Sequence, residues 1–255
     1  MESQSADAQV YADSMSNSSD SSTVIITGAS RGIGRAIALA FARNTGYSLW
    51  LIARRQEELD KTADDCLRSG APRVLTTGCD LSRPDEIEHL SFPGELPPPG
   101  ILVNNAGSFL LKPLEETSRA EFEEQWKLHT LAPFLCTRKW IPIMRDAGQG
   151  LIVMIGSVGA LHGQGRSGAY ASSKHALLGL ARSFRKELKG TSVAVTTILP
   201  GQTESDSWNG VEVDSEELID PRDIGELIVT LGRLSPRTVV EEIRINPALG
   251  ERSPD

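Results

Sequence analysis

Cysteine, aromatic residues and basic charge are scarce in this chain, and each shortage narrows what the protein can do. Its 255 residues include three cysteines and 5% aromatic residues, and 26 lysines and arginines face 34 acidic residues. The net charge of -8 disfavours nucleic acid and anionic membranes as main partners. Cys66, Cys79 and Cys136 are odd in number and widely spaced. We therefore expect reduced, buried thiols in a cytoplasmic protein, and no metal site.

Long apolar runs are also missing. None approaches the roughly 18 residues that a bilayer-spanning helix needs, so we expect no membrane partner. Residues 1–22 contain no lysine or arginine, whereas a secretory signal begins with basic residues and a transit peptide is rich in arginine. Their low apolar content predicts a disordered N-terminal tail. We expect one domain at residues 23–250, followed by a short C-terminal tail at residues 251–255.

From residue 23 onward, short apolar runs alternate with helical patterns. The first run, Thr23-Val-Ile-Ile-Thr27, is typical of a strand that is buried on both faces. The runs predict strands at residues 23–27, 48–53, 73–79, 101–103, 151–155, 193–199 and 240–245. The helical patterns predict helices that begin near residue 33 and others at 57–69, 83–90, 118–147, 170–189 and 221–234. This alternation predicts an α/β fold with a single doubly wound, Rossmann-type parallel sheet of about seven strands and helices on both faces.

The predicted helix at residues 118–147 contains two prolines. Pro133 and Pro142 each lack the N–H that a helix interior uses. We expect them to kink or interrupt this helix.

A glycine-rich turn joins the first strand to the first helix. The sequence Gly28-Ala-Ser-Arg-Gly32-Ile-Gly34 follows directly on the strand. Glycines there let the backbone approach a pyrophosphate, and the amides at the helix N-terminus face its charge. A glycine triplet alone is a weak signal, but its place between strand and helix favours dinucleotide binding.

The ends of the other predicted strands carry further candidate residues. Asp80, Asn104, Ser157 and Pro200 each follow a different strand. Because ligands of doubly wound sheets bind beyond the carboxyl ends of the strands, these segments converge on one edge.

Tyr170 and Lys174 stand four residues apart in a predicted helix and therefore share one face. A phenol titrates near pH ~10 and is a poor acid–base catalyst at neutrality. A positive charge at roughly 4 Å, in an effective dielectric of about 20, contributes about 4 kcal/mol. That charge would lower the phenol pKa by up to roughly three units before desolvation opposes it. On these two residues alone, an ordinary amphipathic helix remains the better interpretation.

Taken together, the motifs resemble those of the short-chain dehydrogenases/reductases. The matching elements are Thr27-Gly-x3-Gly32-x-Gly34, Asn104-Asn-Ala-Gly107, Ser157, Tyr170-x3-Lys174 and Pro200-Gly201. Ser157 precedes Tyr170 by thirteen positions, which is the spacing that the family uses. The resemblance covers about residues 23–245, and parts of it are similar to 3-oxoacyl-carrier-protein reductases and general carbonyl reductases.

This resemblance implies hydride transfer between a nicotinamide cofactor and a small-molecule carbonyl or acyl substrate. Tyr170 would donate the proton, Lys174 would hold the nicotinamide ribose and lower the pKa of Tyr170, and Ser157 would orient the carbonyl. It also implies a homodimer or homotetramer, assembled through the helices predicted at 118–147 and 170–189. The implied cofactor-binding residues are Gly28, Ser30, Arg31, Gly32, Ile33, Gly34, Arg54, Arg55, Asp80, Leu81, Asn104, Ala106, Gly107, Tyr170, Lys174, Pro200, Gly201, Thr203 and Ser205.

The chain departs from the family pattern at three positions. Thr203 stands where the family usually has Val or Ile, and Ser205 where it usually has Thr. His129 stands where the family usually has an Asn that supports the lysine through a water molecule. The imidazole can replace Asn as the group that holds the water, it can titrate near neutrality and alter the proton relay, or His129 can be a packed helix residue. All three interpretations are open, and we include His129 as a candidate catalytic-support residue.

The second predicted strand ends without an acidic residue. An enzyme that selects NAD normally carries Asp or Glu there to bind the ribose hydroxyls, whereas this chain has Ala53 followed by Arg54 and Arg55. Arg31 lies in the glycine turn. Guanidinium groups suit the additional phosphate of NADP(H). We therefore expect NADP(H) as cofactor, with Arg31 and Arg54 as first choices for the phosphate and Arg55 next.

Two alternatives stay open beside an NADP(H)-dependent carbonyl reductase. One is a catalytically silent dinucleotide-binding sensor or scaffold of the same fold. The other is an NAD-linked alcohol dehydrogenase, which the arginines disfavour.

Overall fold

A computed structural model describes residues 22–205, 208 and 213–250. The tail predicted at residues 1–22 lies outside the described residues except for Ser22, and the tail predicted at 251–255 lies wholly outside them.

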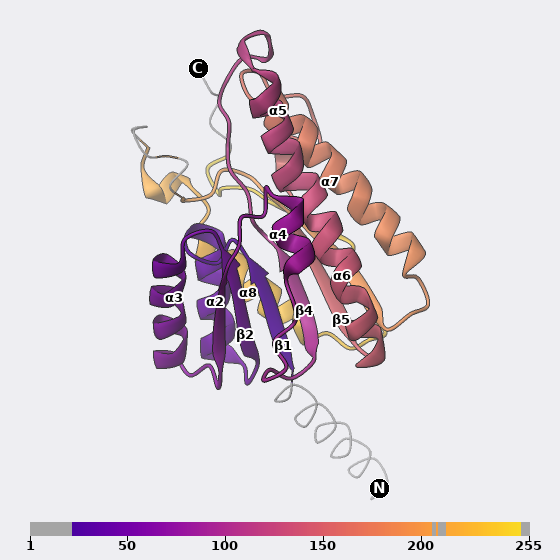
Figure 1. Cartoon of the computed structure of the whole chain (residues 1–255). Coiled ribbons are helices and arrows are strands. Elements are labelled where there is room, and N and C mark those ends of the chain that lie inside the picture. The colour runs from indigo at the N-terminus through magenta and orange to yellow at the C-terminus, as the bar shows by residue number, and fades with distance from the viewer. Residues whose placement is uncertain (1–21, 206–207, 209–212, 251–255) are drawn as a thin grey trace, which may run out of the picture.

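Seven parallel strands form the sheet, in the order β3-β2-β1-β4-β5-β6-β7 (Figure 1). This arrangement confirms the predicted doubly wound α/β fold. Strands β1, β2 and β4 are buried at every residue, as expected for strands covered on both faces. The strands are β1 Thr23–Thr27, β2 Ser48–Ala53, β3 Val74–Gly78, β4 Pro99–Asn104, β5 Gly150–Ile155, β6 Val193–Pro200 and β7 Glu242–Ile245.

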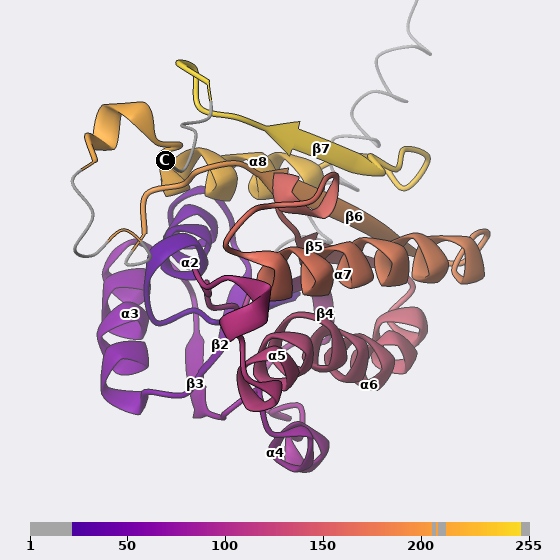
Figure 2. The same cartoon turned by 90° about the horizontal axis from the view of Figure 1, so that it is seen from above.

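Helices cover both faces of the sheet (Figure 2). One apolar layer contains residues of α2 (Gly32–Asn44), α3 (Gln56–Arg68) and α8 (Pro221–Gly232). The layer on the opposite face contains residues of α4 (Pro84–His89), α6 (Ala132–Asp146) and α7 (Gly168–Glu187). Helix α5 (Arg119–Trp126) extends beyond the sheet and packs beside α7.

The predicted helix at 118–147 is interrupted once. A π-helical turn, Lys127–Leu131, separates α5 from α6 immediately before Pro133. Pro133 has no N–H to donate to the carbonyl of His129, which favours local re-pairing with the longer i→i+5 bond that Ala132 makes to Lys127. Pro142 does not interrupt the helix, because α6 continues through it. Pro142 and Arg138 are exposed, so water can satisfy the carbonyl that Pro142 leaves unpaired.

The three cysteines are buried and free, as predicted. Burial raises the pKa of Cys66 and Cys136 to about 12 and that of Cys79 to about 11. No helix within the described ranges is long and apolar enough to cross a membrane.

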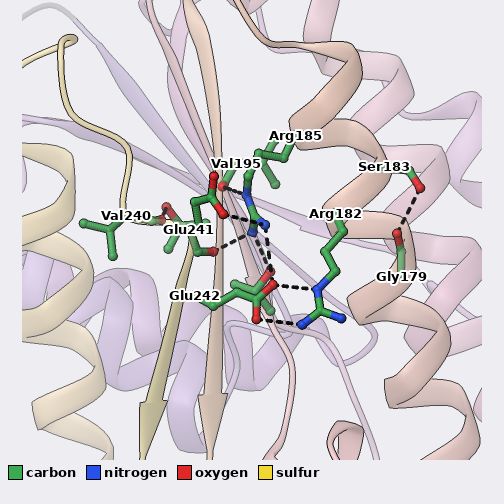
Figure 3. Close-up of polar contacts among 10 residues, drawn as sticks. Gly179, Arg182, Ser183, Arg185, Val195, Val240, Glu241 and Glu242 are labelled. Atoms are coloured by element: carbon green, nitrogen blue, oxygen red, sulfur yellow. Dashed lines mark hydrogen bonds and ion pairs between the residues drawn. The ribbon is translucent and has the colours of Figure 1, made fainter.

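An ionic network attaches the edge strand β7 to α7 (Figure 3). The Arg185 guanidinium donates to the carbonyl oxygens of Val195 at 3.0 Å and Glu241 at 2.5 Å. The pairing of β6 with β7 begins at Thr197 and Glu242, so Val195 precedes this ladder. Arg185 therefore donates to backbone carbonyls just before the β6–β7 ladder begins, and only 13% of its side chain is exposed. Arg182 pairs with the same Glu242 at 2.7 Å but is 53% exposed.

Replacing Arg185 with Met should lower the free energy of unfolding by about 2–3 kcal/mol, because the part-buried guanidinium donates charged hydrogen bonds to two backbone carbonyls and pairs with Glu242, and all of these contacts are lost. The matched change Arg182→Met should cost less than about 1 kcal/mol, since an exposed ion pair contributes little. Urea unfolding followed by circular dichroism measures both. Equal losses in the two variants would contradict the role assigned to Arg185.

Candidate active site

Two loops meet beyond the carboxyl ends of β1 and β4. The hydroxyl of Thr27 accepts hydrogen bonds from the backbone amides of Asn105 at 2.9 Å and Ala106 at 3.1 Å. The side-chain amide of Asn105 donates back to the carbonyl of Thr27 at 2.9 Å and that of Gly28 at 3.2 Å. The glycine turn and the Asn104-Asn-Ala-Gly107 segment are thus fixed against each other, as the convergence of strand ends predicted.

The glycine turn leaves room for a ligand on one side only. A Cβ at Gly34 would lie 2.2 Å from the carbonyl oxygen of Gly28, so only glycine fits there. Gly32 has φ +52°. A Cβ placed on Gly32 would have the Cβ of Ser205 as its nearest neighbour, at 3.8 Å. The backbone amides that begin α2 therefore adjoin open space that an anion can occupy. These backbone amides fit a pyrophosphate. The fold also places Ser205, another predicted cofactor-binding residue, beside the glycine turn.

Three predicted catalytic residues lie together at the ends of β5 and α7. Ser157 follows β5, and its hydroxyl interacts with the phenol of Tyr170 in a way that lowers the pKa of Tyr170. Lys174 is 5% exposed and donates to the carbonyl oxygen of Ile155 at 2.9 Å. Its Nζ lies 5.7 Å from the centroid of the Tyr170 ring. The shared helix face thus places ammonium and phenol side by side.

Burial controls the protonation of this pair. It raises the pKa of Tyr170 above its ordinary value, and the interaction with Ser157 offsets the rise only in part. The desolvation that opposes the charge of Lys174 is the larger effect here, so the pKa of Tyr170 is raised on balance. Burial also lowers the pKa of Lys174, from its ordinary 10.5 to about 8. Tyr170 accordingly keeps its proton throughout the neutral range.

His129 lies in the π-helical turn and is 1% exposed. The backbone N–H of Ser108 donates to its Nε2 at 3.1 Å, so the proton of the neutral imidazole is on Nδ1. Nδ1 then donates to the hydroxyl of Ser173 at 2.8 Å, and this hydroxyl donates to the carbonyl oxygen of Tyr170 at 2.7 Å. The ring also contacts the edge of Tyr170, with centroids 5.4 Å apart.

This environment decides the protonation state of His129. Burial first, and the charge of Lys174 second, place its pKa well below the ordinary 6.5. The expectation that the imidazole titrates near neutrality is therefore wrong. His129 is a neutral residue that joins the loop after β4 to the helix that carries Tyr170.

The remaining predicted positions lie after β3, at the end of β4 and after β6. Asn104 is buried and donates to Thr137 at 3.1 Å, so its side chain braces β4 against α6 and does not face the glycine turn. Asp80 accepts from the amide of Ser82 at 3.0 Å in a tight turn that positions the buried Leu81. Gly201 donates to Ile245 at 2.7 Å, and Thr203 bonds the carbonyl of Gly201 at 3.0 Å, which directs the chain after Pro200 back toward the glycine turn.

The predicted arginines lie at the start of α2 and α3. Arg31 precedes α2 and Arg55 precedes α3. The positive charges of both lower the pKa of one carboxyl group, that of Glu58. Arg54 is exposed.

Sequence reasoning missed Ser173, Phe109 and Glu58. Phe109 packs its edge on Tyr170, with centroids 5.0 Å apart, and is 45% exposed. It stands two residues after Gly107, and a large apolar residue beside a predicted ligand-binding loop was the available signal. Ser173 stands next to Lys174, where helical spacing alone did not relate it to residue 129. Glu58 stands three residues after Arg55, which is a spacing for ion pairs on a helix.

Lys174→Met should stabilise the protein at neutral pH. Between about pH 8 and 10.5 the unfolded chain keeps a proton on Lys174 that the folded chain has lost, so stability rises with pH across this window. Below pH 8 the buried ammonium is charged and lowers the free energy of unfolding by about 3 kcal/mol. The Met variant avoids this cost but loses the hydrogen bond to Ile155, which stabilises the wild type by about 1 kcal/mol. We expect a gain of about 2 kcal/mol at pH 7 that disappears toward pH 10. Urea unfolding at both values measures it, with the exposed Lys186→Met of the same helix as control. A loss at pH 7 would contradict the cost of burying this ammonium.

His129→Asn tests the neutral state of the imidazole. In the unfolded chain His129 takes up a proton below pH ~6.5, and in the folded chain it does so only at much lower pH. Wild-type stability should therefore fall as the pH drops from 7.5 to 5.5, by about 1.4 kcal/mol more than in His129→Asn. Chemical unfolding over this range measures the difference, and His162→Asn is an exposed control. Parallel pH dependence in wild type and His129→Asn would mean that the imidazole has the same pKa in the folded protein as in the unfolded chain, which would contradict its assignment as neutral by burial.

Known proteins share this arrangement. A sequence profile described as short chain dehydrogenase matches residues 22–216. The chain is 36% identical over 189 residues to a short chain dehydrogenase of Pseudocercospora fijiensis, a match that covers 72% of this chain and 60% of that relative, under two thirds of its length. It is 30% identical over 244 residues to the sepiapterin reductase of Chlorobaculum tepidum, covering 91% of this chain and 98% of that one.

A solved structure extends the likeness to the whole fold. The alcohol dehydrogenase from the archaeon Thermococcus sibiricus, complexed with 5-hydroxy-NADP, matches with a TM-score of 0.84 at 29% identity. The match covers 91% of this chain and 99% of that one. A profile match over most of the residues, together with relatives that align along nearly the full length, shows that the chain belongs to the short-chain dehydrogenase/reductase family of oxidoreductases.

Proposed function

We propose that the protein is an NADP(H)-dependent reductase that converts a carbonyl group to an alcohol. The observation that carries the proposal is that Ser157, just after β5, lies with Tyr170 and the buried Lys174, whose Nζ is 5.7 Å from the centre of the Tyr170 ring. A silent sensor or scaffold would not need these three groups together. Substrates of the proposed class are small ketones or 3-oxoacyl thioesters.

The two hydroxyls define where the carbonyl oxygen binds. Because the hydroxyl of Ser157 acts on the phenol of Tyr170, an oxygen placed between them can accept a hydrogen bond from each. Tyr170 keeps its proton at neutral pH because burial raises its pKa, and this is the state a proton donor needs. As the oxygen gains charge during reduction, the phenol proton passes to it, and Ser157 continues to hold the oxygen in place.

Lys174 has a positioning and an electrostatic role in this proposal. Its ammonium would hold the nicotinamide ribose and stabilise the phenolate that remains after the proton transfer. With a pKa of about 8, Lys174 is charged through the neutral range. The raised pKa of Tyr170 favours reduction at neutral pH, and alcohol oxidation, which starts from the phenolate, requires higher pH.

Bound NADPH would supply the hydride, and residues of the glycine turn and the arginines would hold it. The amides at the start of α2 suit its pyrophosphate, and Ser30, Arg31, Arg54 and Arg55 suit the phosphate on its adenosine ribose. Support comes from the missing acid at the end of β2 and from the NADP derivative bound by the archaeal relative.

We also propose that a second copy of the chain covers the outer side of α5. Phe122 and Trp126 stand four residues apart on this helix and are 40% and 45% exposed. Apolar side chains at this spacing share a face, and α5 lies beside α7 as the predicted interface requires.

Tyr170→Phe should abolish carbonyl reduction and leave NADPH binding nearly unchanged, because only the proton donor is removed. NADPH oxidation with a panel of ketones, quinones and 3-oxoacyl thioesters measures the first effect, and NADPH fluorescence titration the second. Tyr47→Phe is the matched control and should retain activity. If the Tyr170→Phe variant keeps more than roughly a hundredth of wild-type turnover, the phenol is not the proton donor.

A further inference from the structure

One carboxylate lies among the groups that would bind the adenosine phosphate. Glu58 is in the first turn of α3, and its Oε1 forms an ion pair with the Nη1 of Arg55, the residue that precedes this helix. Only 33% of the Glu58 side chain is exposed. The ion pair with Arg55 first, and then Arg31 and the hydroxyl of Ser30, favour the ionised carboxylate, so the pKa of Glu58 lies below its ordinary value.

The backbone keeps Glu58 in this position. The hydroxyl of Thr62, one turn further along α3, bonds the carbonyl oxygen of Ser30 at 3.3 Å and that of Glu58 at 3.2 Å. The first turns of α3 are therefore fixed against the glycine turn. Rotation of its side chain is the simplest way for Glu58 to leave the arginines.

A carboxylate and a phosphate need the same donors. Ser30, Arg31 and Arg55 were each predicted to bind the cofactor, and all three act on Glu58. A phosphate monoester brings close to two negative charges, so it cannot share these donors with a carboxylate without repulsion. NAD(H) has only hydroxyl groups at this position and meets no such repulsion.

We propose that Glu58 competes with the adenosine phosphate of NADP(H) for Ser30, Arg31 and Arg55, and so sets the preference between NADP(H) and NAD(H). It is a specificity-determining residue that weakens NADP(H) binding relative to what the arginines alone would give. This inference rests on the proposed function, because it requires a nicotinamide dinucleotide at the glycine turn.

The test is the cofactor affinity of Glu58→Gln. Glutamine keeps the length and shape of the side chain but removes its charge. Dissociation constants for NADPH and NADH, measured by nicotinamide fluorescence at low ionic strength, should show NADPH binding roughly three- to tenfold tighter. NADH binding should change less than about twofold, because it carries no phosphate at this site. Adenosine 2′,5′-bisphosphate, titrated by calorimetry, should gain affinity as NADPH does, and 5′-AMP should not.

Glu57→Gln is the matched control. Glu57 precedes Glu58 in the same turn and is exposed, so its removal changes the net charge equally. It should leave both dissociation constants nearly unchanged. Arg55→Met should reduce the gain from Glu58→Gln, because the carboxylate then has one competitor donor fewer.

Unchanged or weaker NADPH binding by Glu58→Gln would overturn the inference, since Glu58 would then be neutral or would hold the arginines in place for the phosphate. An equal gain for NADH, or the same gain from Glu57→Gln, would overturn it as well. These results leave the proposed function intact as long as wild type binds NADPH. Failure of wild type to bind either cofactor would overturn the proposed function, and the inference with it.

Discussion

The hydroxyl of Thr27 is the point on which the site depends. It accepts hydrogen bonds from the amides of Asn105 and Ala106, and so fixes the loop after β4 to the end of β1. Two residues further on, the amide of Ser108 holds His129, and His129 holds Ser173 in the helix of Tyr170. One series of hydrogen bonds thus runs from the glycine turn to the backbone of Tyr170. The spacing between the glycine turn and Tyr170 follows from these bonds, because parallel strands alone fix only the edge on which both lie.

Burial gives the site its chemical properties and lowers the stability of the fold. The phenol of Tyr170 stays protonated and the ammonium of Lys174 becomes a weaker base because water is excluded from both. A charged lysine at this depth has one described acceptor, the carbonyl oxygen of Ile155. Other parts of the structure offset the cost. Arg185, for example, ties the edge strand to α7 through backbone carbonyls and an ion pair. The free energy of unfolding that burial of Lys174 lowers is thus offset by contacts such as those of Arg185, which lie away from the candidate site.

The sequence was sufficient to predict the fold and the edge of the sheet at which the candidate residues meet, because both follow from short-range patterns. β-branched runs, the glycine turn and the four-residue spacing of Tyr170 and Lys174 are local signals, and the predicted strands β1 and β2 agree with the structure to the residue. The protonation states did not follow from spacing. The charge of Lys174 acts on Tyr170 against a desolvation cost that depends on burial, and residues distant in sequence create that burial. For the same reason the partner of His129 was not predicted: Ser173 lies 44 residues away, and the π-helical turn that aims the imidazole at it arises from α5 and α6 together.

The nucleotide end of the site shows how one residue can serve stability and limit binding. Arg31 and Arg55 carry like charges to the same place, and without an anion between them they would repel each other. Glu58 supplies that anion from within the chain and lets both guanidinium groups remain beside the glycine turn. A phosphate can take its place only by offering the arginines more than the carboxylate does, and its second negative charge gives it that advantage. If the site binds NADP(H) as proposed, this internal carboxylate stabilises the Arg55 guanidinium when no nucleotide is bound and lowers the affinity for the adenosine phosphate.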